Sequence, residues 1–218
     1  MPQVLYEDKN IIVVNKPLGM LSEDGNGRES LVSVVCDYMN GEPVYILHRL
    51  DCGVGGAVAF AKNKKVAAEM SSVMANHGFY KEYLAVLPYA PSSKQGELCD
   101  MLFKDSSKNK VFVVKSMRKG AKEAKLKYET IKSSPSGHAL VRVMPYTGRT
   151  HQIRVQFASR KLPILGDGKY GSRIKCGIAL FCHRLKFEYP SGKVIDVSVN
   201  PPSVFPFSEF YYVDMLIN

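Results

Sequence analysis

The sequence predicts an α+β protein with a mixed, largely antiparallel central sheet that is flanked by helices and loops. Segments with strand composition outnumber those with helical periodicity, and several strand segments are separated only by hairpin-length turns. The length of 218 residues suffices to bury a hydrophobic core. Because neither a repeat nor an obvious linker divides the chain, we expect a single domain over residues 1–218, without an appended module.

The first part of the chain alternates strand and helix patterns. A β-branched run at 11–14 ends at a Lys-Pro pair and predicts a strand. Apolar residues at helical spacing predict a short helix over about 29–39. The apolar segments at 45–47 and 57–61 predict two further strands, which lie on either side of the sequence HRLDCGVGG.

A second helix is expected after Asn63, whose side chain suits a helix N-cap. The apolar stripe that follows contains Met70 and Met74, and Gly78 lies where the helix is expected to stop. We expect these methionines to fill the core rather than to bind a ligand.

The rest of the chain is dominated by strand patterns, with one helix among them. Strands are expected at 79–89, 111–114, 122–130, 138–145, 179–189 and 193–199. A helix is expected over 149–160, with Thr150 as its cap and with Ile153 and Phe157 on one face.

The chain is strongly basic. Thirty Lys and Arg against 20 Asp and Glu give a net charge of +10 and a pI near 9.3, which favours an anionic partner, nucleic acid before an anionic membrane surface. Nine basic residues fall within 104–127, where Asp105 and Glu123 are the only acids. This stretch is expected either to contact phosphates or to form a solvated hairpin surface.

Several classes of protein are excluded by composition. The sequence contains no run of 18 apolar residues, so no transmembrane helix is expected, and the N-terminus lacks the pattern of a secretion signal. The five cysteines, Cys36, Cys52, Cys99, Cys176 and Cys182, form no CxxC pair. We therefore expect no zinc site and no disulfide framework, and a reducing cytoplasm as the compartment.

Three segments carry candidate chemistry. In HRLDCGVGG, the carboxylate of Asp51 lies among His48, Arg49 and three glycines, so that it could stay ionised as a nucleophile or base, or could simply begin a turn. In FYKEYLAVL, Lys81 and Tyr83 lie in an apolar strand, where the tyrosine could pack in the core or stack on a base.

The third segment is PYTGRTHQIRV at 145–155. Arg149, His151, Gln152 and Arg154 crowd the start of the expected helix. Cations are unfavourable at a helix N-terminus unless an anion accompanies them, so an anion-binding function is favoured over a solvated helix face.

These motifs, in this order, resemble the RluA-type RNA pseudouridine synthases. HRLD followed by Gly-Gly and VAFAKN resembles the motif around the catalytic aspartate, KEYLAV the second motif, and GRTHQIRV with PILGDGKYG the third. The opening LYEDKNIIVVNKP also matches, and the resemblance covers residues 4–200. It implies the catalytic fold of that family.

The resemblance also implies roles for residues. Asp51 would be the catalytic aspartate, Tyr83 would stack against the target base, and either Arg149 or Arg154 would pair with the aspartate. Arg49 would enter the RNA stack when the target uridine flips out. We further expect four residues to contact RNA: His48, Lys81, His151 and Gln152.

Two departures from the family pattern are noted. Val54-Gly55 stands where the family often has Thr-Ser, and Phe181 stands where it often has histidine. The first departure leaves open a second hypothesis, a non-catalytic RNA-binding protein on the same scaffold.

The implied reaction converts uridine in RNA to pseudouridine without metal or organic cofactor. Asp51 would either attack C1′ or remove a proton from C2′. A hydrolytic nucleoside glycosidase is a third hypothesis, and it would need a second carboxylate such as Glu82 or Asp167. We expect structured ribosomal or transfer RNA as the partner, with neither a membrane nor a protein partner, and a monomeric state.

Overall fold

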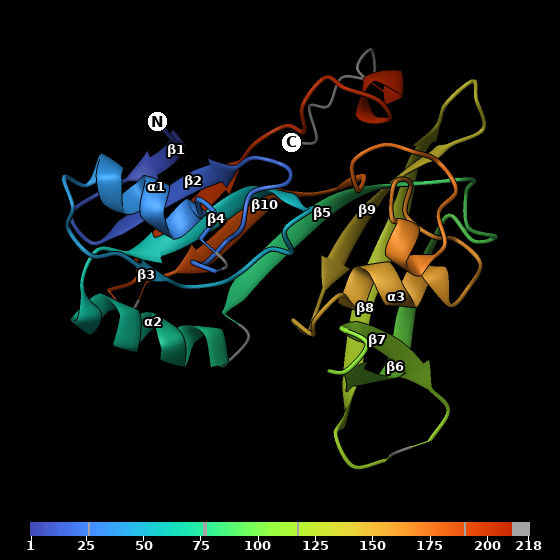
Figure 1. Ribbon diagram of the computed structural model, residues 1–218, viewed down its shortest axis with the longest axis horizontal. Helices are drawn as coiled ribbons and strands as arrows, with labels where there is room; N and C mark the ends of the chain where they lie inside the picture. The colour runs from blue at the N-terminus through green and yellow to red at the C-terminus, as the bar shows by residue number, and fades with distance from the viewer. Residues whose placement is uncertain (26, 76–77, 117, 190, 211–218) are drawn as a thin grey trace. The chain divides into compact units, whose positions relative to one another are not determined.

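The alternating and β-branched segments of the chain form strands, and the computed structural model describes residues 1–25, 27–75, 78–116, 118–189 and 191–210 (Figure 1). The chain divides into unit 1, Met1–Lys81 with Phe181–Pro201, and unit 2, Glu82–Leu180 with Pro202–Asn218. Each unit joins strands and helices, which confirms the α+β class. The single domain expected from the sequence stays a prediction.

Unit 1 is built on a mixed sheet. Its elements are β1 (Gln3–Glu7), β2 (Ile11–Lys16), α1 (Leu31–Tyr38), β3 (Tyr45–Ile46), β4 (Gly55–Ala61), α2 (Lys64–Ala75), most of β10 (Leu180–Glu188), and β11 (Val194–Ser198). The pairs β1–β2, β2–β4, β3–β4 and β10–β11 are antiparallel, whereas β4 and β10 run parallel.

Side-chain caps begin both helices of unit 1. Ser30 accepts a hydrogen bond from the backbone N–H of Ser33, whose hydroxyl accepts one from the N–H of Ser30, a reciprocal capping box. The side chain of Asn63 accepts from the N–H of Val66 at 3.0 Å, which confirms the cap expected for α2.

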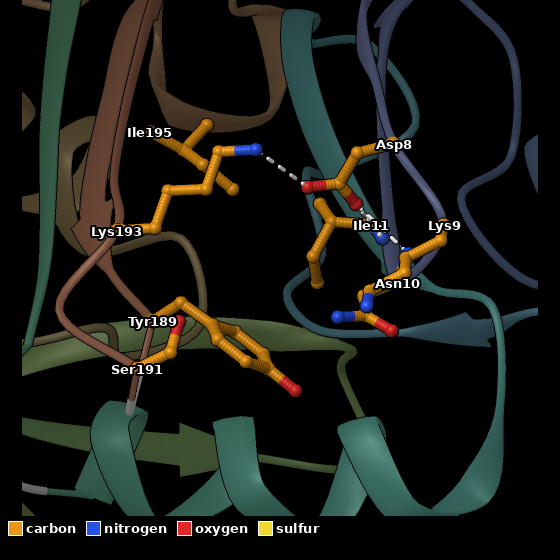
Figure 2. Close-up of a pocket in the computed structure, with 8 residues that line it drawn as sticks. All are labelled: Asp8, Lys9, Asn10, Ile11, Tyr189, Ser191, Lys193 and Ile195. Carbon is orange, nitrogen blue, oxygen red and sulfur yellow. Dashed lines mark hydrogen bonds and ion pairs between the residues drawn. The ribbon is translucent and has the colours of Figure 1, made fainter.

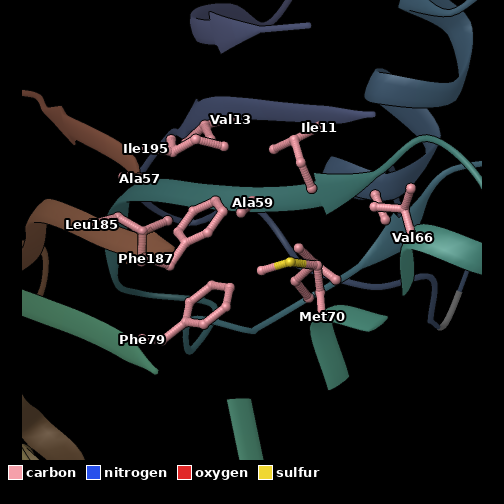
Figure 3. Packing of buried hydrophobic residues seen from close by; sticks show 12 residues of the cluster. Ile11, Val13, Ala57, Ala59, Val66, Met70, Phe79, Leu185, Phe187 and Ile195 are labelled. Atoms are coloured by element: carbon pink, nitrogen blue, oxygen red, sulfur yellow. The ribbon is translucent and has the colours of Figure 1, made fainter. Parts of the chain in front are cut away.

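The core of unit 1 lies between its sheet and α2 (Figure 3). Met70 is fully buried, Met74 packs against the same cluster, and the rings of Phe79 and Phe187 stack at 4.5 Å. The expectation that these methionines fill the core is confirmed.

Unit 2 carries an antiparallel sheet in the order β5-β9-β8-β6-β7. Its elements are the greater part of β5 (Phe79–Leu87), β6 (Gln95–Asp105), β7 (Lys110–Val114), β8 (Ala121–Ser133), β9 (Ala139–Pro145), α3 (Gln152–Ala158), and the 3₁₀ turns η1 (Gly168–Tyr170) and η2 (Phe207–Phe210). Helix α3 packs through Val155 on a face of the sheet that contains Leu102, Val111 and Ala124.

Helix α3 is shorter than the sequence suggests, and the expected cap is wrong. His151, not Thr150, occupies the N-cap, with a left-handed φ of 51° and no side-chain cap bond. The side chain of Gln152 instead accepts hydrogen bonds from the Thr147 hydroxyl and the Arg149 N–H, and this closes the preceding turn. Among the described residues, no helix is long and apolar enough to cross a membrane.

Candidate active site

In unit 1, the loop between β3 and β4 carries Asp51. The N–H of Val54 donates to the Asp51 carbonyl at 2.9 Å, which closes a tight turn. The buried hydroxyl of Ser22 donates to the carbonyl of Leu50 at 2.7 Å and accepts from its N–H. These bonds hold the backbone on both sides of a partly buried carboxylate.

A buried lysine adds to the rigidity of this loop. Lys16, at the end of β2, is fully buried, and its Nζ donates to the carbonyls of Met20 at 2.6 Å, Cys52 at 3.1 Å and Pro17 at 3.2 Å. Burial lowers the pKa of Lys16 to about 8, while the charges of Cys52 and Asp51 act in the opposite direction. The loop that carries Asp51 is therefore built around a cation. Lys16 was not among the expected site residues, although the Lys-Pro pair at the strand end marks it.

His48 is buried in the same loop. Its Nε2 accepts from the Ala59 N–H at 3.3 Å, and its ring meets Phe79 edge to face at 5.9 Å. Burial, and secondarily the charge of Lys81, lowers the pKa of His48 to about 3, so the ring is neutral at physiological pH. This setting favours a structural role over the RNA contact that the sequence suggests.

Arg49 points the other way. Its guanidinium forms an ion pair with Glu23 at 2.6 Å, and the two side chains are 66% and 44% exposed. Exposed ion pairs contribute little to stability, so this arginine can exchange Glu23 for another anion at small cost.

The two departures from the family pattern meet across one strand pair. Gly55 of β4 is the register partner of Phe181 of β10. A Cβ at Gly55 would lie 3.1 Å from Phe181 and from Leu18, and 3.0 Å from the Lys16 carbonyl. Glycine at 55 therefore leaves room for phenylalanine at 181, so these two positions are matched in packing volume.

Lys81 and Tyr83 lie along β5. Lys81 is partly buried, and burial lowers its pKa against the opposing charge of Cys182. Tyr83 is the register partner of Val143 in β9 and is only 8% exposed. Its ring is therefore held in a packed strand.

In unit 2, the two arginines that the resemblance offers as the partner of the aspartate have different surroundings. Arg149 is exposed, and its Nε donates to the Glu123 carbonyl at 3.0 Å. Gln152 is buried, with its amide bonded to Thr147, to Arg149 and to the Lys125 carbonyl. As with His48, this favours a structural role for Gln152 over RNA contact.

Arg154 is buried and held in a fork. Its Nε and one terminal nitrogen donate to the two carboxylate oxygens of Asp167 at 2.6 and 2.9 Å. Its guanidinium lies 5.2 Å from the ring of Tyr170, whose hydroxyl is 2.9 Å from Nδ1 of His151. The PILGDGKYG segment thus orients Arg154, a role for Asp167 and Tyr170 that the sequence did not indicate.

The carboxylates that a hydrolytic glycosidase would need are placed against cations. Asp167 is the bidentate partner of Arg154, and the buried Glu82 lies 3.3 Å from Nε of Arg142. Both are only a few per cent exposed, so neither is placed to activate a water molecule from solvent.

A small cavity in unit 1 lies apart from the expected residues (Figure 2). It has a volume of about 130 Å³, and Asp8, Lys9, Asn10, Ile11, Tyr189, Ser191, Lys193 and Ile195 line it. Burial alone would raise the pKa of Asp8, but its carboxylate accepts hydrogen bonds from Tyr6, from two backbone N–H groups and from Lys193, and together these lower the pKa. The cavity lies between the turn at 8–11 and the segment that contains Tyr189 and Lys193, which the Lys193–Asp8 ion pair joins.

Comparisons with known proteins bear on these motifs. Residues 10–159 match the model of the RNA pseudouridylate synthase family. An uncharacterized RNA pseudouridine synthase of Haemophilus influenzae is 30% identical over 189 residues, 86% of this chain and 82% of that protein. The dual-specificity RNA pseudouridine synthase RluA of Escherichia coli K12 is 34% identical over 178 residues, 78% of this chain and 77% of that one.

Other relatives are longer. An uncharacterized RNA pseudouridine synthase of Mycoplasma genitalium is 31% identical, and the chain spans 63% of its length. The fold is similar to that of human RNA pseudouridylate synthase domain containing 1, with a TM-score of 0.81 at 20% identity over 94% of this chain and 85% of that one. The matched residues include the Asp51 loop, Tyr83 and both arginines, and the chain belongs to the RNA pseudouridylate synthase family.

Proposed function

We propose that this protein converts specific uridines of ribosomal or transfer RNA to pseudouridine, with Asp51 as the catalytic aspartate. The observation that carries the proposal is the construction of the Asp51 loop. A buried Lys16 ammonium bonds the Cys52 carbonyl and the Ser22 hydroxyl bonds the Leu50 backbone, so buried groups fix the chain on both sides of Asp51. Preorganisation of this kind is what a catalytic group requires.

The reaction is an isomerisation, so its atoms balance without a co-reactant. The bond between N1 and C1′ breaks, the uracil turns, and C5 forms the new bond to C1′ as its proton leaves and N1 gains one. Asp51 either attacks C1′ or takes the C2′ proton. Because a stacked base is out of reach, the nucleotide is extruded first, and we assign Arg49 to the space it leaves, since this arginine is exposed and weakly held.

Of the two arginines, we assign Arg154 to the reaction. Its orientation is set by the Asp167 fork and by burial, whereas Arg149 is exposed and contacts a carbonyl. Tyr83 serves the same reaction as the ring against the target base, and Lys81 and His151 remain candidate RNA contacts. We further propose that the enzyme acts in the cytoplasm, as a monomer and without a protein partner.

The test is complementation. A strain lacking the gene is mapped for pseudouridines across ribosomal and transfer RNA, which identifies the target. Asp51→Asn should leave that site as uridine and lower turnover on the matching transcript by roughly 10²–10⁴-fold, with RNA affinity little changed. Asp37→Asn makes the same chemical change at an exposed carboxylate and should behave as wild type.

The same assay separates the arginines. Arg154→Lys, which cannot reproduce a bidentate fork, should lose most activity, and Arg149→Lys should retain it. Normal turnover by Asp51→Asn, or a deletion strain with every pseudouridine in place, would contradict the proposed function and favour a non-catalytic RNA-binding protein.

A further inference from the structure

The outer strands of the unit 2 sheet have two different faces. Side chains alternate along a strand, and Leu102 of β6 and Val111 of β7 point to the face that carries α3. The neighbouring positions on the opposite side are Met101 and Phe103 of β6 and Phe112 and Val114 of β7. We call these four residues the open face.

The open face is apolar and only partly covered. Phe103 and Phe112 are direct register partners, as are Met101 and Val114, so the four side chains form one contiguous patch. Phe112 is 36% exposed, and the other three are partly exposed. An apolar patch that stays exposed in this way indicates a binding surface.

Cations lie against both rings of this patch. The guanidinium carbon of Arg118 is 3.4 Å from the ring centroid of Phe103, the distance of stacked planes, and Nζ of Lys110 is 5.8 Å from that of Phe112. A guanidinium stacked on an aromatic ring presents a flat, positively charged surface, on which a nucleobase stacks well.

The surroundings of the open face are basic as well. Between residues 104 and 127 the chain has nine Lys and Arg against two acids. By strand alternation Lys104 and Lys122 lie on the face that carries α3, and Glu123, the register partner of Met101, lies on the open face. Lys115, Arg118 and Lys119 are exposed in the segment between β7 and β8. One of the two acids, Asp105, is bound to Lys108 and Ser107. Lysine is depleted at protein–protein interfaces, so this charge favours a polyanion over a second protein.

We propose that the open face binds an unpaired stretch of RNA, with bases stacked on Phe112 and on the Phe103–Arg118 pair and with phosphates held by Lys115, Arg118 and Lys119. The proposal rests on the proposed function only in that the RNA is the substrate. It adds a surface that grips RNA outside the nucleotide that reacts.

The test compares two RNA probes, a labelled 12-nucleotide oligouridylate and a 12-base-pair RNA duplex, by fluorescence anisotropy. The variant Phe103→Leu/Phe112→Leu removes both rings while it keeps apolar volume. It should bind the oligouridylate roughly tenfold more weakly and the duplex as wild type does. Tyr89→Leu removes an exposed aromatic ring elsewhere in unit 2 and should change neither affinity.

A second variant tests the same surface without changing a residue in strands β6 and β7, so that an effect on strand packing cannot explain both results. Lys115→Ala/Arg118→Ala/Lys119→Ala alters exposed loop residues, and it should reduce the salt dependence of oligouridylate binding, at about 0.7 in the log–log slope for each lost phosphate contact. Lys132→Ala, at an exposed position farther along β8, is the matched control.

Equal oligouridylate affinity in wild type and both variants would overturn the proposal. So would a wild-type dimer, seen by sedimentation, that the double Leu variant loses, because the face would then be a protein interface. Binding does not need turnover, so Asp51→Asn should bind the oligouridylate as wild type does. Oligouridylate affinity therefore tests the open face, and turnover tests the role of Asp51, so that either proposal can be rejected without the other.

Discussion

At the scale of single residues, two buried ionisable side chains support the Asp51 loop by opposite means. Lys16 satisfies its ammonium with three carbonyls, whereas His48 is neutral and accepts one backbone N–H. The local sequence leaves open whether Asp51 is catalytic or simply begins a turn, and it is the resemblance of the ordered motifs to the pseudouridine synthases that predicts the catalytic role. The sequence does not reveal that His48 and Gln152 point inward, because polar side chains are buried wherever packing supplies their hydrogen bonds.

Arg49 and Glu23 offer a prediction at this scale. Arg49→Ala removes the proposed intercalating cation and should lower kcat/KM by roughly 10–100-fold, since base extrusion costs a few kcal/mol that must be offset. Its effect on the free energy of unfolding should be within about 1 kcal/mol. Steady-state assays and urea unfolding measure the two quantities.

Glu23→Ala is the matched control for that variant. It breaks the same 2.6 Å ion pair but leaves the arginine in place, so kcat/KM should stay at or above the wild-type value. Equal losses in the two variants would mean that the ion pair, and not the free cation, matters.

At the scale of elements, the sequence predicts what local patterns specify. Both helices of unit 1 and strands β2 to β5 and β7 to β11 lie where expected. Strand β6 was not predicted, because Asp100 interrupts the apolar alternation between the buried Leu98 and Leu102, and charged residues lie on both of its faces. The bond between Arg154 and Asp167 also escapes local reading, since the loop after α3 brings the partners together.

The strand pair β4–β10 carries a prediction about packing. Gly55→Ser introduces a Cβ about 3.1 Å from Phe181 and should destabilise the protein by about 1–3 kcal/mol. Phe181→His shortens the facing side chain but buries a polar ring, so alone it is also destabilising. The double variant should lose less free energy of unfolding than the two single variants lose in sum, by at least about 0.5 kcal/mol.

Urea unfolding of the two single variants and the double variant gives this coupling. The control pairs Gly55→Ser with Ile195→Val in β11, which is outside the residues that a Cβ at 55 would meet, and should be additive. Additivity in the test pair as well would show that positions 55 and 181 do not share volume.

At the scale of the whole molecule, positive charge and buried groups together govern stability in acid. The net charge of +10 at pH 7 rises as carboxylates are protonated, and the added repulsion weakens the folded state. His48 contributes a separate and assignable part of this loss. Its pKa is about 3 in the folded protein, whereas a histidine of the unfolded chain has a pKa of about 6.5.

The sign of this effect follows from proton binding. Between pH 6.5 and pH 3 the unfolded chain holds the His48 proton and the folded protein does not, so acid favours unfolding. The stability that the neutral ring provides is complete above pH 6.5, and roughly 2–3 kcal/mol of it is lost by pH 4.5. His48→Gln lowers stability at pH 7 because it disturbs the packing against Phe79, yet it should flatten the pH dependence. Urea unfolding at pH 7, 5.5 and 4.5 measures both curves, and because every other titrating group is common to the two proteins, parallel curves would show that His48 is protonated as readily in the folded state as in the unfolded chain.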